Sequence, residues 1–216
     1  TTTSGTVYKD MNGKKYAENI SQLALANVDF DMQNRHHISY NLMMIHANTQ
    51  SVGDYNGKNS IFSDDYENLG FTRRQQTNDN MLIVNQLMSN WGLTKSLSLD
   101  AGASYNMVKG YEPDRRINNL TKAEDGYTLL RGNSQQRYFS TLDEDDLNVK
   151  AGLVYRLKDN IEEISNVRFG YTGRFVDDNF KATEYNLTVG HVYTIPSLDN
   201  FSLDDYYNQE NFRSEE

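Results

Sequence analysis

Residues 145–177 contain two runs in which apolar and polar side chains alternate strictly, and a polar turn joins the runs. The apolar positions are Leu147, Val149, Ala151, Leu153, Tyr155 and Leu157 in the first run, and Val167, Phe169, Tyr171, Gly173 and Phe175 in the second. A period of two places successive side chains on opposite faces of a strand. The pattern therefore predicts a β-hairpin with one apolar and one polar face.

Similar runs occur along the rest of the chain and predict further strands. These runs cover 22–32, 38–44, 80–91, 97–107 and 185–193, and a weaker run begins at Phe201. Short turn-rich stretches separate most of them, at 33–35, 93–95, 158–165, 177–179 and 194–199. In two ranges, 47–77 and 109–145, the alternation disappears, and both are predicted to be long loops. The prediction is an all-β antiparallel meander of seven or eight strands, with residues 1–216 forming a single segment.

The predicted connections divide between the two ends of such a meander. Most short turns fall at one end and the long loops fall at the other, with 177–179 as the exception. Short turns on one side and long loops on the other are typical of outer-membrane barrels, whereas long structureless loops are uncommon in compact soluble domains. The run Leu97–Met107 also matches the ~9–11 residues of a tilted transmembrane strand. A soluble antiparallel sandwich or lipocalin-like barrel produces the same alternation and is the alternative.

The charge and the residue composition of the chain argue against several classes of function. The net charge of −9 and the lack of a Lys/Arg cluster argue against nucleic-acid binding. The chain has no Cys, which excludes a disulfide framework and a thiolate metal site. No apolar run approaches the ~18 residues of a transmembrane helix, and the first residues lack the apolar core of a signal peptide.

Four cations on the polar face of the predicted hairpin, Lys150, Arg156, Arg168 and Arg174, are candidate ligand-binding groups. If the turn is centred near Glu162, Arg156 faces Arg168 and Lys150 faces Arg174. Like charges directly opposite each other destabilise a strand pair, so these side chains are expected to have acidic partners elsewhere. In a large barrel, a plug domain inside the lumen or an anionic ligand would supply them. A hydrated wall with counterions is the alternative interpretation.

The acidic residues Asp143, Glu144, Asp145 and Asp146 follow one another on the side of the predicted long loops, where the second loop passes into the hairpin. They are candidates for binding Ca²⁺, or for bridging through divalent ions to lipopolysaccharide phosphates, but they lack EF-hand spacing. Solvated loop charge is the simpler interpretation. The adjacent His36 and His37 should point to opposite faces of a strand, which prevents them from chelating one ion side by side. Hydrolase, metalloprotease, redox and phosphate-loop motifs are missing, so neither an enzyme nor a cofactor is expected.

The segments RGNSQQRYFSTLDEDDLNVKAGLVYRLKD and VRFGYTGRFVDDNFKATEYNL resemble the mid-barrel region of TonB-dependent outer-membrane receptors, particularly large ones with an N-terminal carboxypeptidase-regulatory-like domain. The resemblance covers about Asn80–Leu203 and rests on the general residue pattern of these segments, without an invariant motif. It implies a barrel of about 22 strands with a plug inside, and energised import of a scarce nutrient. Its implied partners are TonB and a plug domain through the full-length chain, with a surface lipoprotein as a further candidate. The chain has no TonB box, plug or terminal aromatic residue, so it is expected to be a piece of a longer polypeptide.

The combined expectation is part of a TonB-dependent transporter in the bacterial outer membrane. The odd positions of its hairpin would contact lipid and lipopolysaccharide, and the even positions would line the lumen. The predicted loops 47–77 and 109–145 would face outside and help to capture a glycan, a peptide or a metal chelate. Two alternatives stay open. Pairing of 22–32 with 201–207 would favour a small eight-stranded outer-membrane barrel, acting as an adhesin or structural protein. Stability without detergent would favour a soluble β-rich binding module.

Overall fold

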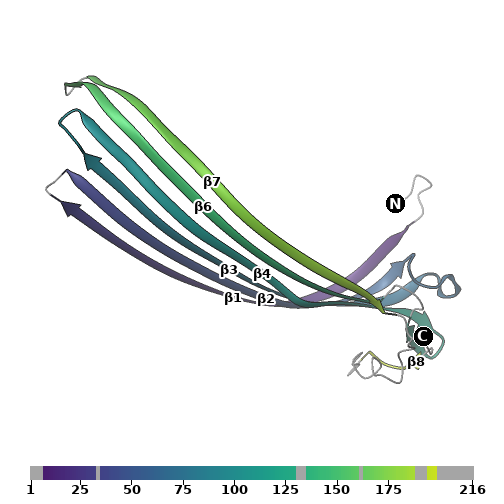
Figure 1. Cartoon of the computed structure of the whole chain (residues 1–216). Helices are drawn as coiled ribbons and strands as arrows, with labels where there is room; N and C mark the ends of the chain where they lie inside the picture. The colour runs from purple at the N-terminus through teal and green to yellow at the C-terminus, as the bar shows by residue number, and fades with distance from the viewer. Residues whose placement is uncertain (1–6, 33–34, 130–134, 161–162, 188–193, 199–216) are drawn as a thin grey trace, which may run out of the picture.

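The computed structural model describes residues 7–32, 35–129, 135–160, 163–187 and 194–198, which form one antiparallel β-sheet. Within these residues, six long strands lie side by side in the order β1-β2-β3-β4-β6-β7 and make a curled, half-barrel-like sheet (Figure 1). They are β1 (Lys9–Met32), β2 (His36–Asn59), β3 (Leu69–Gly92), β4 (Leu97–Ala123), β6 (Gln135–Asn160) and β7 (Glu163–Leu187). The shorter elements are β5 (Gly126–Leu129), β8 (Thr194–Ile195) and the 3-10 helix η1 (Asp64–Tyr66). The predicted all-β antiparallel meander is confirmed.

Tight connections join β1 to β2, β3 to β4 and β6 to β7 at one end of the sheet, here called the short-turn end (upper left in Figure 1). Thr94 builds the second of these turns, because its hydroxyl accepts hydrogen bonds from the main-chain N–H groups of Ser96 (3.2 Å) and Leu97 (3.0 Å). The break between β3 and β4 confirms the turn predicted at 93–95. The turns predicted at 33–35 and 158–165 include residues outside the description, 33–34 and 161–162, and the strands on either side of each pair with one another. Among the described residues, no helix has the length and hydropathy needed to cross a bilayer.

The long loops predicted over 47–77 and 109–145 are wrong over most of their length. Residues 60–68 alone separate β2 from β3, and 124–134 separate the long strands β4 and β6. The turn predicted at 177–179 is also wrong, because β7 runs straight through it. In these ranges polar residues occupy both faces, so the alternation disappears while the backbone ladder continues.

The long strands have 24–27 residues, or about 80–90 Å at ~3.4 Å per residue. That length is well over twice the ~30 Å hydrocarbon thickness of a bilayer. The predicted run from Phe201 lies outside the described residues, as does the part of the predicted strand 185–193 beyond Leu187.

At the end opposite the short turns, β4 leaves β6 and a small packed region forms. The β4–β6 ladder stops at Ile117, after which β4 pairs with β5, and β5 pairs with β8. Gln135 is fully buried there. Its Oε1 accepts hydrogen bonds from Asn118 Nδ2 (3.2 Å) and the Asn119 main-chain N–H (3.1 Å), and its Nε2 donates to the Asn119 carbonyl (2.6 Å). This side chain replaces the strand partner that β4 has lost. The apolar core of the region consists of Phe71, Leu120, Leu129 and Ile195.

Candidate functional site

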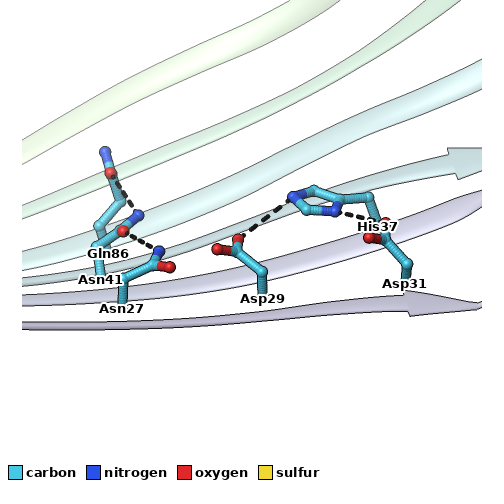
Figure 2. A network of polar contacts seen from close by, with 6 residues as sticks. All are labelled: Asn27, Asp29, Asp31, His37, Asn41 and Gln86. Atoms are coloured by element: carbon cyan, nitrogen blue, oxygen red, sulfur yellow. Dashed lines mark hydrogen bonds and ion pairs between the residues drawn. The ribbon is translucent and has the colours of Figure 1, made fainter.

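One row of side chains shows how strand register organises the sheet. Starting at Asn27 on β1, successive register partners cross the six long strands, and every member is polar. The row is Asn27, Asn41, Gln86, Ser104, Asn148 and Arg174. Figure 2 shows its start, where Asn27 Nδ2 donates to Asn41 Oδ1 (2.7 Å) and Asn41 Nδ2 donates to Gln86 Oε1 (3.4 Å). At this level, one face of the sheet is polar from edge to edge. Two positions further along the strands, the row on the same face is apolar on β1 to β3 and at the β7 edge. That row is Leu25, Met43, Val84, Asn106, Asp146 and Val176.

The next position along each strand belongs to the opposite face, and its row is apolar. That row is Val28, Tyr40, Leu87, Ala103, Val149 and Gly173. We define the apolar band as the odd positions from Leu97 to Met107 on β4 together with their register partners. Ser89 and Asn85 interrupt it on β3, and its last row, that of Met107, continues to Asp145 and Asp177. Ten steps of ~3.4 Å make the band about 34 Å long along the strand, or about 26 Å tall at a tilt of ~40°.

The apolar band is the more exposed of the two faces. Leu87 is 49% exposed and Phe169 is 81% exposed, whereas Ser39 and Asp146 on the polar face are 5% and 9% exposed. Hollows of about 420 and 460 Å³ lie on the polar face, so its side chains converge on the inner side of the curl. A sheet of a water-soluble protein normally buries its apolar face. In this sheet the apolar face is the exposed one, and no second layer of described residues covers the band.

Beyond Met107, towards the end opposite the short turns, the two faces stop differing. Residues 46–59 of β2 read HANTQSVGDYNGKN, and residues 69–80 of β3 read LGFTRRQQTNDN. Ion pairs now join the strands, since Arg73 donates from Nε and Nη2 to the Asp54 carboxylate at 2.8 and 2.9 Å. We call this part of the sheet, beyond Met107 and away from the short turns, the outer half. Its side chains are suited to water on both faces.

A second ion-pair cluster of the outer half centres on Asp114. Arg137 donates to its two carboxylate oxygens at 3.0 and 2.6 Å, and Arg116 Nε lies 2.5 Å from Oδ2. Burial alone would raise the pKa of Asp114, but the hydrogen bonds and charges of Arg137 and Arg116 outweigh burial and hold the pKa below its ordinary value. The charged carboxylate thus ties β4 to β6 where a bulge between Glu112 and Arg115 interrupts their ladder.

The four predicted ligand-binding cations lie on the polar face, but in a different register from the one expected. The observed register partners are Thr172 for Lys150, Asn166 for Arg156, Val154 for Arg168 and Asn148 for Arg174. The expected oppositions of Arg156 with Arg168 and of Lys150 with Arg174 are therefore wrong. The turn and a bulge after Arg156 shift the pairing, and the shift separates the like charges.

Arg174 finds its acidic partner on the neighbouring strand. Its Nε lies 3.2 Å from both carboxylate oxygens of Asp146, and its Nη2 lies 3.1 Å from Oδ2. Asn148 Nδ2 donates to the same carboxylate at 3.0 Å. Lys150 and Arg168 line the hollow of about 460 Å³, and neither forms an ion pair with another described residue.

The four acidic candidates lie in β6, so their placement in a loop is wrong. Consecutive strand positions alternate, which puts Asp143 and Asp145 on the face of the apolar band and Glu144 and Asp146 on the polar face. Asp145 accepts a hydrogen bond from the Tyr105 hydroxyl (2.7 Å). The candidate Ca²⁺ site is thus divided between two faces. Nowhere in the described ranges do three or more His, Asp or Glu side chains gather in a way that could hold a metal ion.

The histidine pair separates as the alternation predicts. His36 packs against Trp91 on the apolar face, with ring centroids 4.9 Å apart. His37 lies on the polar face between two carboxylates of β1, with Nδ1 2.8 Å from Asp31 Oδ1 and Nε2 3.5 Å from Asp29 Oδ1 (Figure 2). Sequence reasoning missed this contact. The spacing of Asp29 and Asp31 places both carboxylates on one face, but only the register brings His37 opposite them.

A comparison with known protein families finds no family model that matches this sequence, and a comparison with characterised proteins finds no match either.

Proposed function

We propose that this chain is a section of the wall of an outer-membrane β-barrel, with its apolar band against lipid and its polar face towards the water-filled interior. The observation that carries the proposal is the reversed exposure of the two faces. Apolar side chains such as Leu87 and Phe169 are open, while polar side chains such as Ser39 and Asp146 converge inside the curl. Contact with hydrocarbon accounts for such a band without a covering layer.

The dimensions of the band support the same proposal. Its height of about 26 Å agrees with the ~25 Å apolar belt of transmembrane barrels. The polar continuation of every long strand past this belt then extends into water, away from the short turns. In such barrels the short turns face the periplasm and the longer connections face outside.

The edges of the sheet indicate a barrel with more strands than those described. Along the described residues, β1 forms its ladder with β2 alone and β7 with β6 alone. Unpaired main-chain N–H and C=O groups cost several kcal/mol each in hydrocarbon. Both edges therefore require further strands where they cross the membrane, as in a large barrel.

We propose further that the complete barrel is a TonB-dependent transporter that imports a nutrient. Support comes from the resemblance of about Asn80–Leu203 to the mid-barrel region of that family and from the amides and cations on the inner face. Its uptake of labelled nutrients should stop when TonB is removed from the bacterium. Uptake that continues without TonB would reject this class of transporter while leaving the wall assignment intact.

The wall assignment itself is tested by spin labelling along β4. The chain has no Cys, so single cysteines can be placed at each position from Leu97 to Ala123 of the full-length protein in lipid vesicles once any cysteine elsewhere in that protein is replaced by Ser. Between Leu97 and Met107, labels at odd positions should be relaxed by dissolved oxygen, and labels at even positions by a water-soluble nickel chelate. From Lys109 onwards the chelate should reach both faces.

Two results would reject the proposal. Access of the nickel chelate to both faces from Leu97 to Met107 would show a sheet in water. Odd positions that neither oxygen nor chelate reaches would show a band covered by protein, as in a soluble β-rich module.

A further inference from the structure

A hollow of about 410 Å³ lies at the short-turn end of the sheet and gathers three cations from three different segments. Arg35 comes from the connection between β1 and β2, Lys95 from the turn between β3 and β4, and Arg156 from β6. Hydroxyl groups of Thr94, Ser96 and Ser98 also line it. These residues are far apart in the sequence, and only the sheet brings them together.

The hollow opens on the polar face. Ser98 pairs with Gly92 on one side and with Val154 on the other, and all three occupy polar-face positions. A Cβ built on Gly92 would lie 3.6 Å from Arg35 Cβ and 3.8 Å from its Nε. The Arg35 side chain therefore extends over the polar face, and Arg156 occupies an even position of β6 on the same face.

Main-chain hydrogen bonds hold the cation-bearing segments in place. The Gly92 N–H donates to the Arg35 carbonyl (2.8 Å), and the Arg156 N–H donates to the Ser96 carbonyl (2.8 Å). The ladder between β6 and β7 shifts its register immediately after Arg156. Such bulges re-aim a side chain and are frequent beside functional sites. The three cations thus converge through a preorganised backbone.

Their charges have no acidic partner among the residues that line the hollow, and the nearest described carboxylate on this face, Asp100, accepts a hydrogen bond from Asn90. Arg73, Arg137 and Arg174 elsewhere in the sheet each contact an aspartate. By contrast, Arg35, Lys95 and Arg156 form no ion pair with any residue whose side chain the structure describes, and no such carboxylate lines the hollow. The side chains of 158–164 lie outside this description. Three converging positive charges repel one another, and a bound anion relieves that repulsion. Guanidinium, ammonium and hydroxyl donors together suit the oxygens of a phosphate or carboxylate group.

We propose that this hollow is an oxyanion-binding site at the short-turn mouth of the polar face, with Arg35, Lys95 and Arg156 as the binding cations. The bound group is either a free anion or a carboxylate of a polypeptide segment that enters the mouth, and the two sources share the same chemistry. The inference rests on the wetted inner face proposed above. It adds a binding site that the wall assignment does not require.

The test uses the full-length protein in lipid vesicles with one cysteine at Ser98→Cys, and a control cysteine at Asn27→Cys. Asn27 lies on the same face, but on β1 beside Asp29 and Asp31. The cysteines react with two thiol reagents of similar size, one carrying a sulfonate and one a trimethylammonium group. The same rates are measured in a variant with Arg35→Gln, Lys95→Gln and Arg156→Gln, and in the presence of excess inorganic phosphate.

For a free anion, Ser98→Cys should favour the sulfonate reagent by roughly tenfold over the preference at Asn27→Cys, since local potentials change association rates by ~10-fold or more. Phosphate should slow the reaction, and the triple glutamine variant should lose the preference. For an occupying carboxylate of the polypeptide, Ser98→Cys should be inert to both reagents and become reactive in the triple variant.

Three other outcomes would reject the proposed oxyanion-binding site. Equal preferences at the two cysteines, or a Ser98→Cys that is inert with and without the three cations, would reject oxyanion binding. If Asn27→Cys is also inert to both reagents, the inner face is not wetted. In that case the wall assignment fails and the oxyanion site fails with it.

Discussion

Replacing Leu87 with Arg tests the lipid contact of the apolar band directly. Leu87 lies on β3 opposite Tyr40 and Ala103, and its side chain is 49% exposed. Ala103 stands one residue from the middle of Leu97–Met107, so the row of Leu87 lies within about 3 Å of the centre of the band. If the band faces lipid, a cation at that depth is surrounded by hydrocarbon.

The expected cost of Leu87→Arg is about 2–4 kcal/mol, which is the range for Arg at the bilayer midplane on the lipid face of a barrel. The control is Gln86→Arg, one residue away on the polar face. It loses one hydrogen bond from Asn41 (3.4 Å), worth about 0.5–1.5 kcal/mol, and its new charge stays in water. The two substitutions therefore differ in the face they occupy and hardly at all in depth.

Urea unfolding of the full-length protein in lipid vesicles measures both free energies, with the folded fraction read from heat-dependent mobility on unheated gels. If the band faced water, Leu87→Arg would change the free energy of unfolding by about 0.5 kcal/mol or less, as surface substitutions do. Equal effects of Leu87→Arg and Gln86→Arg, or a larger effect of Gln86→Arg, would refute the reasoning.

Three further changes probe other parts of the sheet. Gly170→Ala should destabilise the sheet by about 1–3 kcal/mol, because its Cβ would lie 2.7 Å from a main-chain oxygen of β6. The Cβ of Gly152→Ala meets nothing closer than 3.7 Å, so equal unfolding midpoints for the two variants would contradict the close approach of β6 to β7 at Gly170. Gln135→Ala removes two hydrogen bonds to the buried main chain of Asn119 and should cost about 1–3 kcal/mol. The Asn119 amide should then exchange its hydrogen faster, and unchanged exchange would show that this side chain is dispensable. The pKa of Asp114 is lowered from 3.8 in the folded protein, so its ion pairs stabilise the fold fully above pH 3.8, and this stabilisation is lost as the pH falls through the lowered pKa. Asp114→Asn should therefore weaken the loss of stability on acidification below about pH 3.8. Identical pH profiles would exclude the ion pairs of Asp114 as its cause.

The hairpin and the faces of its side chains were predictable because alternation is a local property of a strand. Wherever one face meets a different environment from the other, the sequence carries a period of two. This holds for Leu97–Met107 and for the runs around Val149 and Phe169. It also correctly separated His36 from His37.

The long polar halves of the strands were not predictable by the same reasoning. Both faces of 46–59 and of 109–123 carry mainly polar side chains, so no period of two appears, and the sequence resembles a loop. These residues are nevertheless held in strands by main-chain hydrogen bonds to neighbours that are already in register. Main-chain pairing leaves no trace in side-chain polarity.

The candidate cations show the same division. Their shared face followed from the even spacing of Lys150, Arg156, Arg168 and Arg174. Their partners did not, because a shift of two in the hairpin pairing decides whether Arg168 meets Arg156 or Val154. That shift depends on the turn geometry and on the bulge after Arg156, and neither has a recognisable residue signature here.

By itself, the sequence determined the all-β class, the turn at 93–95 and the face on which each side chain of the alternating runs lies, since these depend on neighbours close in the chain. The tertiary structure decided the register, the pairing of Arg174 with Asp146, and the convergence of Arg35, Lys95 and Arg156 at one mouth. Those features depend on contacts between strands that are distant in the chain. Main-chain hydrogen bonds between strands set such contacts. Because the main chain is chemically alike at nearly every residue, the sequence does not show which residues will pair.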